Sequence, residues 1–177
     1  MRKIKNEELN RLSPAAFAQS TKKPNAVILE DVRSAMNVGS AFRTADAFAI
    51  EKICLCGITA CPPHREIHKT ALGAQDTVDW QQFDNSKTCL EKLKAEGYRI
   101  VAVEQADKSV SLQHFKVSKS EKYAFAFGNE VYGLSDWLVQ HADIVLEIPQ
   151  YGTKHSLNIS VSIGIILWDY LSKANLF

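Results

Sequence analysis

The chain has 177 residues, of which 46% are hydrophobic and 23% charged, and its formal net charge is +1. This length fits one domain with a sizeable core, and the composition excludes a largely disordered, collagen-like or proline-rich chain. A net charge this small also excludes a protein that holds nucleic acid by bulk charge alone.

The charge is unevenly distributed along the chain. Residues 1–24 contain six Lys or Arg and two acidic residues, a net charge of +4, whereas residues 25–177 carry a net charge of −3. We interpret residues 1–23 as a short basic helical arm and residues 24–177 as the main domain. Such an arm can bind the phosphates of a nucleic acid, and the alternative is a solvated helix face.

The first half of the domain alternates short apolar runs with helical patterns. We expect strands at 26–29 and 53–55, and a helix over 37–48, where apolar residues recur at helical spacing. A second helix is expected over 86–96, with Ser86 as a candidate N-cap.

The second half continues this alternation. Strands are expected at 100–103, 123–127 and 144–148, followed by a helix from about Ser156 to Leu171. That helix is too short to span a bilayer, so we expect no membrane association. No apolar stretch of 7–15 residues follows Met1, which predicts no signal peptide and a cytoplasmic protein. Apolar strands separated by helices predict the α/β class, a parallel sheet flanked by helices.

Three loops that follow strands are dense in Gly, Asn, Ser and charged residues: 30–40, 128–135 and 149–158. In parallel sheets, ligands bind at the loops that leave the carboxyl ends of the strands. In the first loop, Asn37 stands where a helix-capping residue is expected. Arg43 lies about one turn after Gly39 and Ser40 and can reach a bound anion, although a surface ion pair is the alternative.

The other two loops carry further polar residues. The loop 128–135 contains two glycines, which allow a ligand to approach the backbone closely, and the acidic Glu130. No Walker lysine or GxGxxG pattern is present, so nucleoside triphosphate and dinucleotide signatures are absent. In the third loop region we expect Ser156 to cap the last helix. Ser156, Asn158 and Ser160 are more polar groups than one cap requires, and a ligand is a candidate partner.

The cysteines raise the question of a metal. Cys54, Cys56 and Cys61 lie near His64 and His68. The spacing lacks the CxxC pair of common structural zinc sites, and the first two cysteines fall in an apolar run. We expect buried or free thiols and no metal, with a zinc-binding regulatory module as the alternative.

Three segments resemble the ordered motifs of one enzyme family. They are NVGSAFRTADAFAI at 37–50, AFAFGNEVYGLS at 124–135 and IPQYGTKHSLNISVSIGI at 148–165. The family is the SpoU (TrmH-like) RNA 2′-O-ribose methyltransferases of the SPOUT superfamily, and HKTALGA at 68–74 resembles a segment found between its motifs. The resemblance extends from about Pro24 to Leu171. Three residues depart from the family pattern and leave the substrate subclass open: Val131, Gln150 and Ser162.

The resemblance implies an α/β fold with a C-terminal trefoil knot. The knot would bind S-adenosylmethionine as methyl donor, without a metal. The implied cofactor-binding positions are Gly128, Ile148 and Leu157, with Val103 and Glu104 lining the same pocket. It also implies a homodimer with an active site shared across the interface, for which the apolar last helix offers a face.

The implied reaction transfers a methyl group to a ribose O2′ in tRNA or rRNA. In the family the arginine at the position of Arg43 is the essential catalytic residue. We favour phosphate clamping over proton abstraction, because arginine has a pKa above about 12. Asn37 would position Arg43 or the ribose. Three further residues would shape the pocket and the RNA contact: Glu130, Ser156 and Asn158.

RNA binding with a net charge of +1 requires a local positive surface. The basic arm supplies one, and dimerisation would double it. The alternative function is a catalytically silent, knotted RNA-binding protein. The presence of both Arg43 and Asn37 favours the enzyme.

Overall fold

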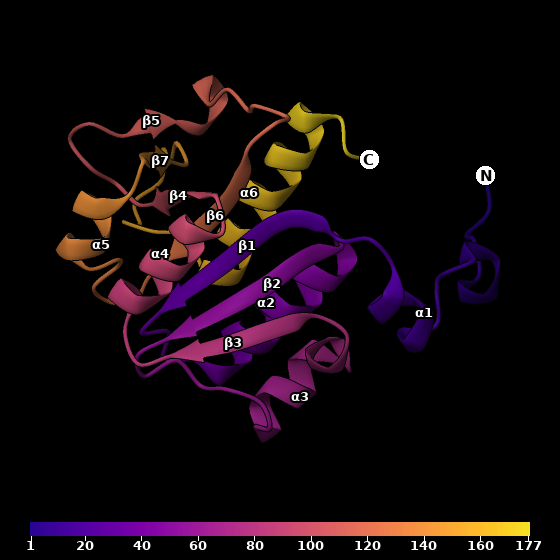
Figure 1. Ribbon diagram of the computed structural model, residues 1–177. Coiled ribbons are helices and arrows are strands. Elements are labelled where there is room, and N and C mark those ends of the chain that lie inside the picture. The colour runs from indigo at the N-terminus through magenta and orange to yellow at the C-terminus, as the bar shows by residue number, and fades with distance from the viewer.

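A computed structural model describes residues 1–177, except for the side chain of Asn6. Seven parallel strands form one sheet in the order β3-β2-β1-β6-β4-β7-β5 (Figure 1). In chain order the strands are β1 (Lys23–Glu30), β2 (Ile50–Cys56), β3 (Asp79–Phe83), β4 (Tyr98–Val103), β5 (Val110–Ser111), β6 (Lys122–Phe127) and β7 (Ile144–Glu147). The predicted parallel α/β sheet is therefore confirmed.

Helices cover both faces of this sheet (Figure 1). One face packs against α2 (Ala35–Ala47), α3 (Arg65–Ala71) and α6 (Ile159–Ala174), and the other against α4 (Ser86–Ala95) and α5 (Asp136–His141). Short 3-10 turns span Asn6–Leu9, Ala74–Asp76 and Leu112–His114. None of the helices in the described part of the chain is long and apolar enough to cross a membrane.

The two faces of the central strand β6 differ in side-chain size. Tyr123 and Phe125 point to the α6 side, whereas Ala124 and Ala126 point to the α4 side, since successive strand residues alternate between faces. The ring of Tyr170 on α6 lies 5.4 Å from that of Phe125, in an edge-to-face arrangement. The large aromatic side chains therefore fix α6 against the middle of the sheet.

Three predicted helix caps are wrong. Ser34 caps α2, accepting a hydrogen bond from the Asn37 N–H at 3.3 Å. Asn85 caps α4 in place of Ser86, and Asn158 caps α6 in place of Ser156. The side chains of Asn37 and Ser86 are instead used in contacts with distant carboxylates, which a local pattern does not reveal.

Several elements were not predicted because they lack an apolar run. The strand β3 lies at a sheet edge with four of its five residues exposed, and β5 has two residues. The helices α3 and α5 have seven and six residues, too few to show a clear periodicity.

The N-terminal arm contains the helix α1 (Pro14–Gln19), which Ser13 caps. It extends from the end of the sheet where β1 begins (Figure 1).

The cysteines lie mainly in the core. Cys54, Cys56 and Cys89 are buried between the sheet and α4, and Cys61 is half-buried. All four thiols are free. Among the side chains that the structure describes, no group of three or more His, Cys, Asp or Glu has a geometry that could hold a metal ion.

Candidate active site

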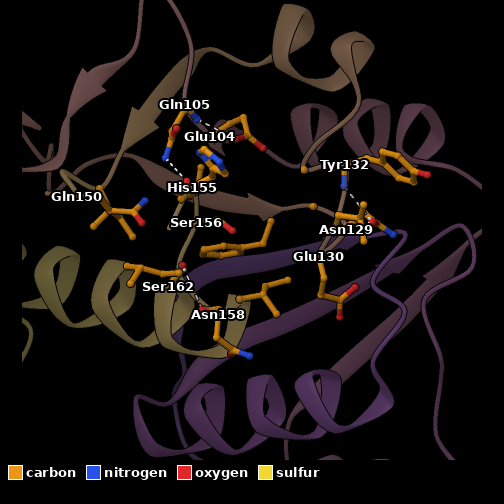
Figure 2. A pocket seen from close by; sticks show the side chains of 18 residues that line it. Glu104, Gln105, Asn129, Glu130, Tyr132, Gln150, His155, Ser156, Asn158 and Ser162 are labelled. Carbon is orange, nitrogen blue, oxygen red and sulfur yellow. Dashed lines mark hydrogen bonds between the residues drawn. The ribbon is translucent and has the colours of Figure 1, made fainter. Parts of the chain in front are cut away.

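A cavity of about 470 Å³ lies at the carboxyl ends of β4, β6 and β7. Its walls come from three segments, 103–105, 127–133 and 148–162. Figure 2 shows Gln105 and His155 on one side of it and Asn158 and Ser162 on the opposite side. The volume falls in the range of roughly 300–1,000 Å³ that small-molecule and cofactor sites occupy.

The five residues predicted to bind a cofactor all line this cavity: Val103, Glu104, Gly128, Ile148 and Leu157. The lining residues that were not predicted include Gln105 and His155. The Gln105 side chain donates a hydrogen bond of 2.8 Å to the carbonyl of His155, which joins two of the three walls (Figure 2). The sequence signal that could have identified them is their position, since Gln105 follows the predicted Glu104 and His155 precedes the predicted Ser156.

The turn after β6 is closed so tightly that only glycine fits at its first position. Asn129 and Gly133 exchange two backbone hydrogen bonds of 2.9 Å. A Cβ at Gly128 would lie 2.1 Å from the carbonyl carbon of Gly133 and 2.2 Å from the nitrogen of Leu134. Gly133 has a positive φ of 69°, where glycine is favoured. Sterics therefore determine the shape of this cavity wall.

Glu104, which directly follows β4, holds the turn 128–134 by hydrogen bonding. Its Oε2 accepts a hydrogen bond of 3.0 Å from the Leu134 N–H, and its Oε1 accepts one of 2.9 Å from the Gln105 N–H. A Cβ at Gly133 would lie 2.2 Å from Glu104 Oε2, so the carboxylate and the turn pack without space between them. Glu104 thus both lines the cavity and holds its wall.

Glu130 links the same loop to the start of α2. Its oxygens accept backbone hydrogen bonds from Arg33 and Ser34 at 3.0 Å each, and one from the Asn37 side-chain amide at 2.9 Å. Partial burial raises the pKa of Glu130, but the hydrogen bonds from these donors lower it by more. The pKa of Glu130 therefore lies below its usual range. The carboxylate is therefore ionised at neutral pH.

Asn158 extends this network to the third predicted loop. Its side-chain nitrogen donates to Asn37 Oδ1 at 3.3 Å, while its Oδ1 accepts from the Ser160 N–H at 2.9 Å. Glu130, Asn37 and Asn158 thus form a continuous chain of contacts across three distant segments. Ser156 also lines the cavity.

Within one chain, Arg43 lies away from this network. It is exposed on α2, six residues after Asn37, which corresponds to about 9 Å along the helix and about 120° around it. It lines a separate hollow of about 680 Å³ between the N-terminal arm, α2 and residues 71–77. A single chain therefore does not bring Arg43 together with the other four predicted catalytic residues.

The bend between β1 and α2 contains site-supporting residues that the sequence did not reveal. Asp31 has a positive φ of 53°, and its carbonyl accepts a hydrogen bond of 2.8 Å from the Asn129 side chain. Its carboxylate accepts one of 3.0 Å from the Ile58 N–H. The buried Thr59 accepts a hydrogen bond of 3.0 Å from the Val32 N–H. These contacts hold an unusual backbone conformation next to the site.

The three segments that build the cavity and network belong to one matching region. The model of the SpoU rRNA Methylase family matches residues 24–168. The chain belongs to this family. The SpoU match includes all of the predicted site residues.

Two similar curated proteins are named for methylation of different classes of RNA. A tRNA (guanosine(18)-2′-O)-methyltransferase of Borreliella burgdorferi is 30% identical over 82% of this chain and 65% of its own length. A 23S rRNA (guanosine-2′-O-)-methyltransferase, RlmB of Neisseria meningitidis, is 31% identical over 81% of this chain and 56% of its own. The chain thus spans between half and two thirds of the length of these curated relatives.

Two solved structures share the fold. The TrmH/SpoU tRNA modifying enzyme of A. aeolicus superposes with a TM-score of 0.79 at 26% identity, over 90% of this chain and 80% of that one. The AdoMet-bound rRNA methyltransferase of Sinorhizobium meliloti also has a TM-score of 0.79, at 28% identity, over 92% of this chain and 61% of that one.

Proposed function

We propose that the protein transfers a methyl group from S-adenosylmethionine to a ribose 2′-hydroxyl of tRNA or rRNA. The observation that carries this proposal is the network of Glu130, Asn37 and Asn158 beside the 470 Å³ cavity. The names of the two relatives above support ribose methylation, one on each class of RNA. The AdoMet-bound structure of similar fold supports the cofactor.

The cavity fits such a cofactor in size and in chemistry. Val103, Ile148 and Leu157 offer apolar surface for a purine ring, and Glu104 and Glu130 place carboxylates on the wall. These charges favour a cationic ligand over an anionic one. When bound, S-adenosylmethionine supplies an activated methyl group on a positively charged sulfonium.

In the proposed reaction the protein acts mainly by positioning. Backbone groups at Gly128, Ile148 and Leu157 hold the cofactor, and the donor is already activated, so alignment of the ribose oxygen dominates the rate. Asn37 and Asn158, oriented by each other and by Glu130, hold the ribose. Ser156 completes the RNA contact from the cavity wall.

We assign Arg43 the role of a phosphate clamp that acts between two copies of the chain. Arg43 lies outside its own cavity network, so a homodimer that brings it to the other cavity would complete the site. Two exposed apolar side chains on α6, Val161 at 49% and Trp168 at 57%, and Met36 on α2 at 46%, support such an interface. We also propose that the C-terminal segment forms a trefoil knot.

In the same proposal, residues 1–23 form a basic arm that contacts RNA phosphates beside the domain 24–177. Replacing both Lys3 and Lys5 by Ala should weaken RNA binding modestly. It should also reduce the slope of log Kd against log salt by about 2, one for each lost phosphate contact. An unchanged slope, measured by filter binding at several salt concentrations, would remove the arm from the RNA interface.

The direct test is transfer of labelled methyl from S-adenosylmethionine to unmodified tRNA and, separately, to rRNA, followed by mapping of 2′-O-methylated nucleotides. Arg43→Ala should lower the rate at least about 100-fold while cofactor binding persists, since removing one charge-stabilising donor typically costs this much. Arg65→Ala, an exposed arginine on α3, is the matched control. Absence of both methyl transfer and cofactor binding would favour a silent RNA-binding protein.

The shared site has its own test. Mixing Arg43→Ala chains with Gly128→Val chains should restore about a quarter of wild-type activity. If half of the dimers are mixed, each contains one intact site, assembled from the wild-type Arg43 of one copy and the wild-type cavity of the other. Activity no higher than that of the two separate variants would place each site within one chain.

A further inference from the structure

Glu30 is a buried carboxylate at the last position of β1, with 4% of its surface exposed. Its Oε2 accepts a hydrogen bond of 2.8 Å from the Ser135 N–H, and its Oε1 accepts one of 2.8 Å from the Ser135 hydroxyl. The Ser86 hydroxyl also donates to Oε1. A buried carboxylate is costly unless its oxygens are satisfied, so these contacts have structural consequence.

The donors come from two places that meet only in the folded chain. Ser135 ends the loop 128–135 and caps α5, 105 residues after Glu30 in the sequence. Ser86 is the first residue of α4. Glu30 therefore joins β1 to two helix starts.

We infer that Glu30 is a positioning residue for the cofactor cavity, a role that rests on the proposed function. It holds Ser135 and thereby the end of the loop that forms one cavity wall. Leu134 precedes Ser135, and its N–H donates a hydrogen bond to Glu104. Gly128 packs directly against Leu134, because a Cβ at Gly128 would lie 2.2 Å from the Leu134 nitrogen. Because this stack has no free space, displacement of Ser135 is transmitted to Gly128.

Glu30 acts at the end of the loop opposite to Glu130. Glu130 attaches the middle of the loop to α2 through Arg33 and Ser34, and Glu30 attaches its last residue to β1. Asp31 lies between Glu30 and Arg33 in the chain, and its carbonyl accepts a hydrogen bond of 2.8 Å from the Asn129 side chain. The loop 128–135 is thus attached at several points to the continuous segment 30–34, and Glu30 is the buried member of these attachments.

The test compares Glu30→Gln and Glu30→Ala with Glu121→Gln. Glu121 is a matched control because it also accepts three hydrogen bonds, from Tyr123 and Arg99, away from the cavity. The measurements are the Kd for S-adenosylmethionine by calorimetry, kcat and the cofactor KM with RNA at saturation, and the thermal midpoint. Glu30→Gln keeps an oxygen for the Ser135 N–H and is the variant expected to fold even if Glu30→Ala does not.

We expect Glu30→Ala to raise the cofactor Kd and KM about 10- to 100-fold and Glu30→Gln about 3- to 10-fold, the range for lost hydrogen bonds to a charged group. At saturating cofactor, kcat should stay within about threefold, because the reacting groups are unchanged. Glu121→Gln should lower the thermal midpoint without changing the cofactor KM.

Equal cofactor Kd for the wild type and for folded Glu30→Gln would overturn the positioning role and leave the proposed function standing. A fall in kcat at unchanged KM would also overturn it. Wild-type protein that binds no S-adenosylmethionine would overturn the proposed function itself, and the assignment of Glu30 with it.

Discussion

The carboxylates at the two ends of the sheet are satisfied in different ways. At the end where the strands begin, Glu96 pairs with Lys52 at 2.8 Å and Glu121 with Arg99 at 2.9 Å. At the end where they finish, Glu30, Glu104 and Glu130 accept hydrogen bonds from backbone N–H groups, hydroxyls and an amide. In the part of the chain that the structure describes, none of these last three forms a salt bridge.

This difference has a physical consequence for the site. Exposed ion pairs neutralise charge and contribute little to stability, typically about 0–1 kcal/mol. A carboxylate held by neutral donors has no cation beside it, and it determines the positions of the backbone N–H groups, hydroxyls and amide that donate to it. The finishing end of the sheet is therefore both negatively charged and geometrically defined, which suits a cationic cofactor.

The largest expected effect comes from breaking the turn that the carboxylates hold. Gly128→Val should raise the cofactor Kd about 100-fold, because its Cβ would lie 2.1 Å from the backbone of Gly133 and over-packing costs up to about 3 kcal/mol. Calorimetric titration with S-adenosylmethionine measures this. Gly152→Ala is the control, since a Cβ there has nothing within 4 Å. Unchanged affinity in Gly128→Val would disprove the placement of the cofactor.

The next effect compares one carboxylate from each end. Glu130→Ala should lower kcat/KM for methyl transfer about 10- to 100-fold, because Arg33, Ser34 and Asn37 all lose their acceptor. Glu96→Ala should change it less than twofold, since Lys52 keeps Glu51 as a partner at 3.4 Å and neither Glu96 nor Lys52 lines the cavity. Similar losses in the two variants would show that the contrast between the ends has no functional meaning.

A smaller effect is expected from salt. Raising NaCl from 0.1 to 1 M shortens the Debye length from about 10 to about 3 Å and should weaken the half-buried ion pairs of Lys52 with Glu96 and of Arg99 with Glu121. The free energy of unfolding should fall by less than about 1 kcal/mol. Hydrogen exchange at the amides of Leu134 and Ser135, which donate to carboxylates, should not change. Faster exchange there would indicate that screened charge holds the loop.

The smallest effect near neutrality concerns pH. Hydrogen bonds lower the pKa of Glu130 despite partial burial, so its contribution to stability is present above the unfolded pKa of about 4.3 and is lost as pH falls through the lower folded value. The free energy of unfolding that Glu130 contributes should therefore be constant from pH 7 to 5 and fall only below about 4.5. The measurement is the difference in unfolding free energy between the wild type and Glu130→Gln, from denaturant titrations at each pH, and a loss of this difference with a midpoint near pH 6 would contradict the prediction.

Much of the fold could be predicted from the sequence because the buried strands have distinctive composition. The runs in β1, β4 and β6 are apolar on both faces, which indicates a parallel sheet covered by helices. The edge strand β3 could not be found this way, since four of its five residues are exposed. The predicted caps at Asn37, Ser86 and Ser156 were wrong because local patterns do not show which polar side chain is used by a distant partner.

The sequence by itself determined the α/β class, the three loops and the family, since each depends on residue type and spacing along the chain. Through the family resemblance it also predicted five cofactor positions, all of which line the cavity. Only the tertiary structure decided how the site is held together. The contacts of Glu130 with Asn37 and of Glu30 with Ser135 join residues 93 and 105 positions apart. Such pairings depend on the order of strands in the sheet, so they cannot be deduced from local propensity.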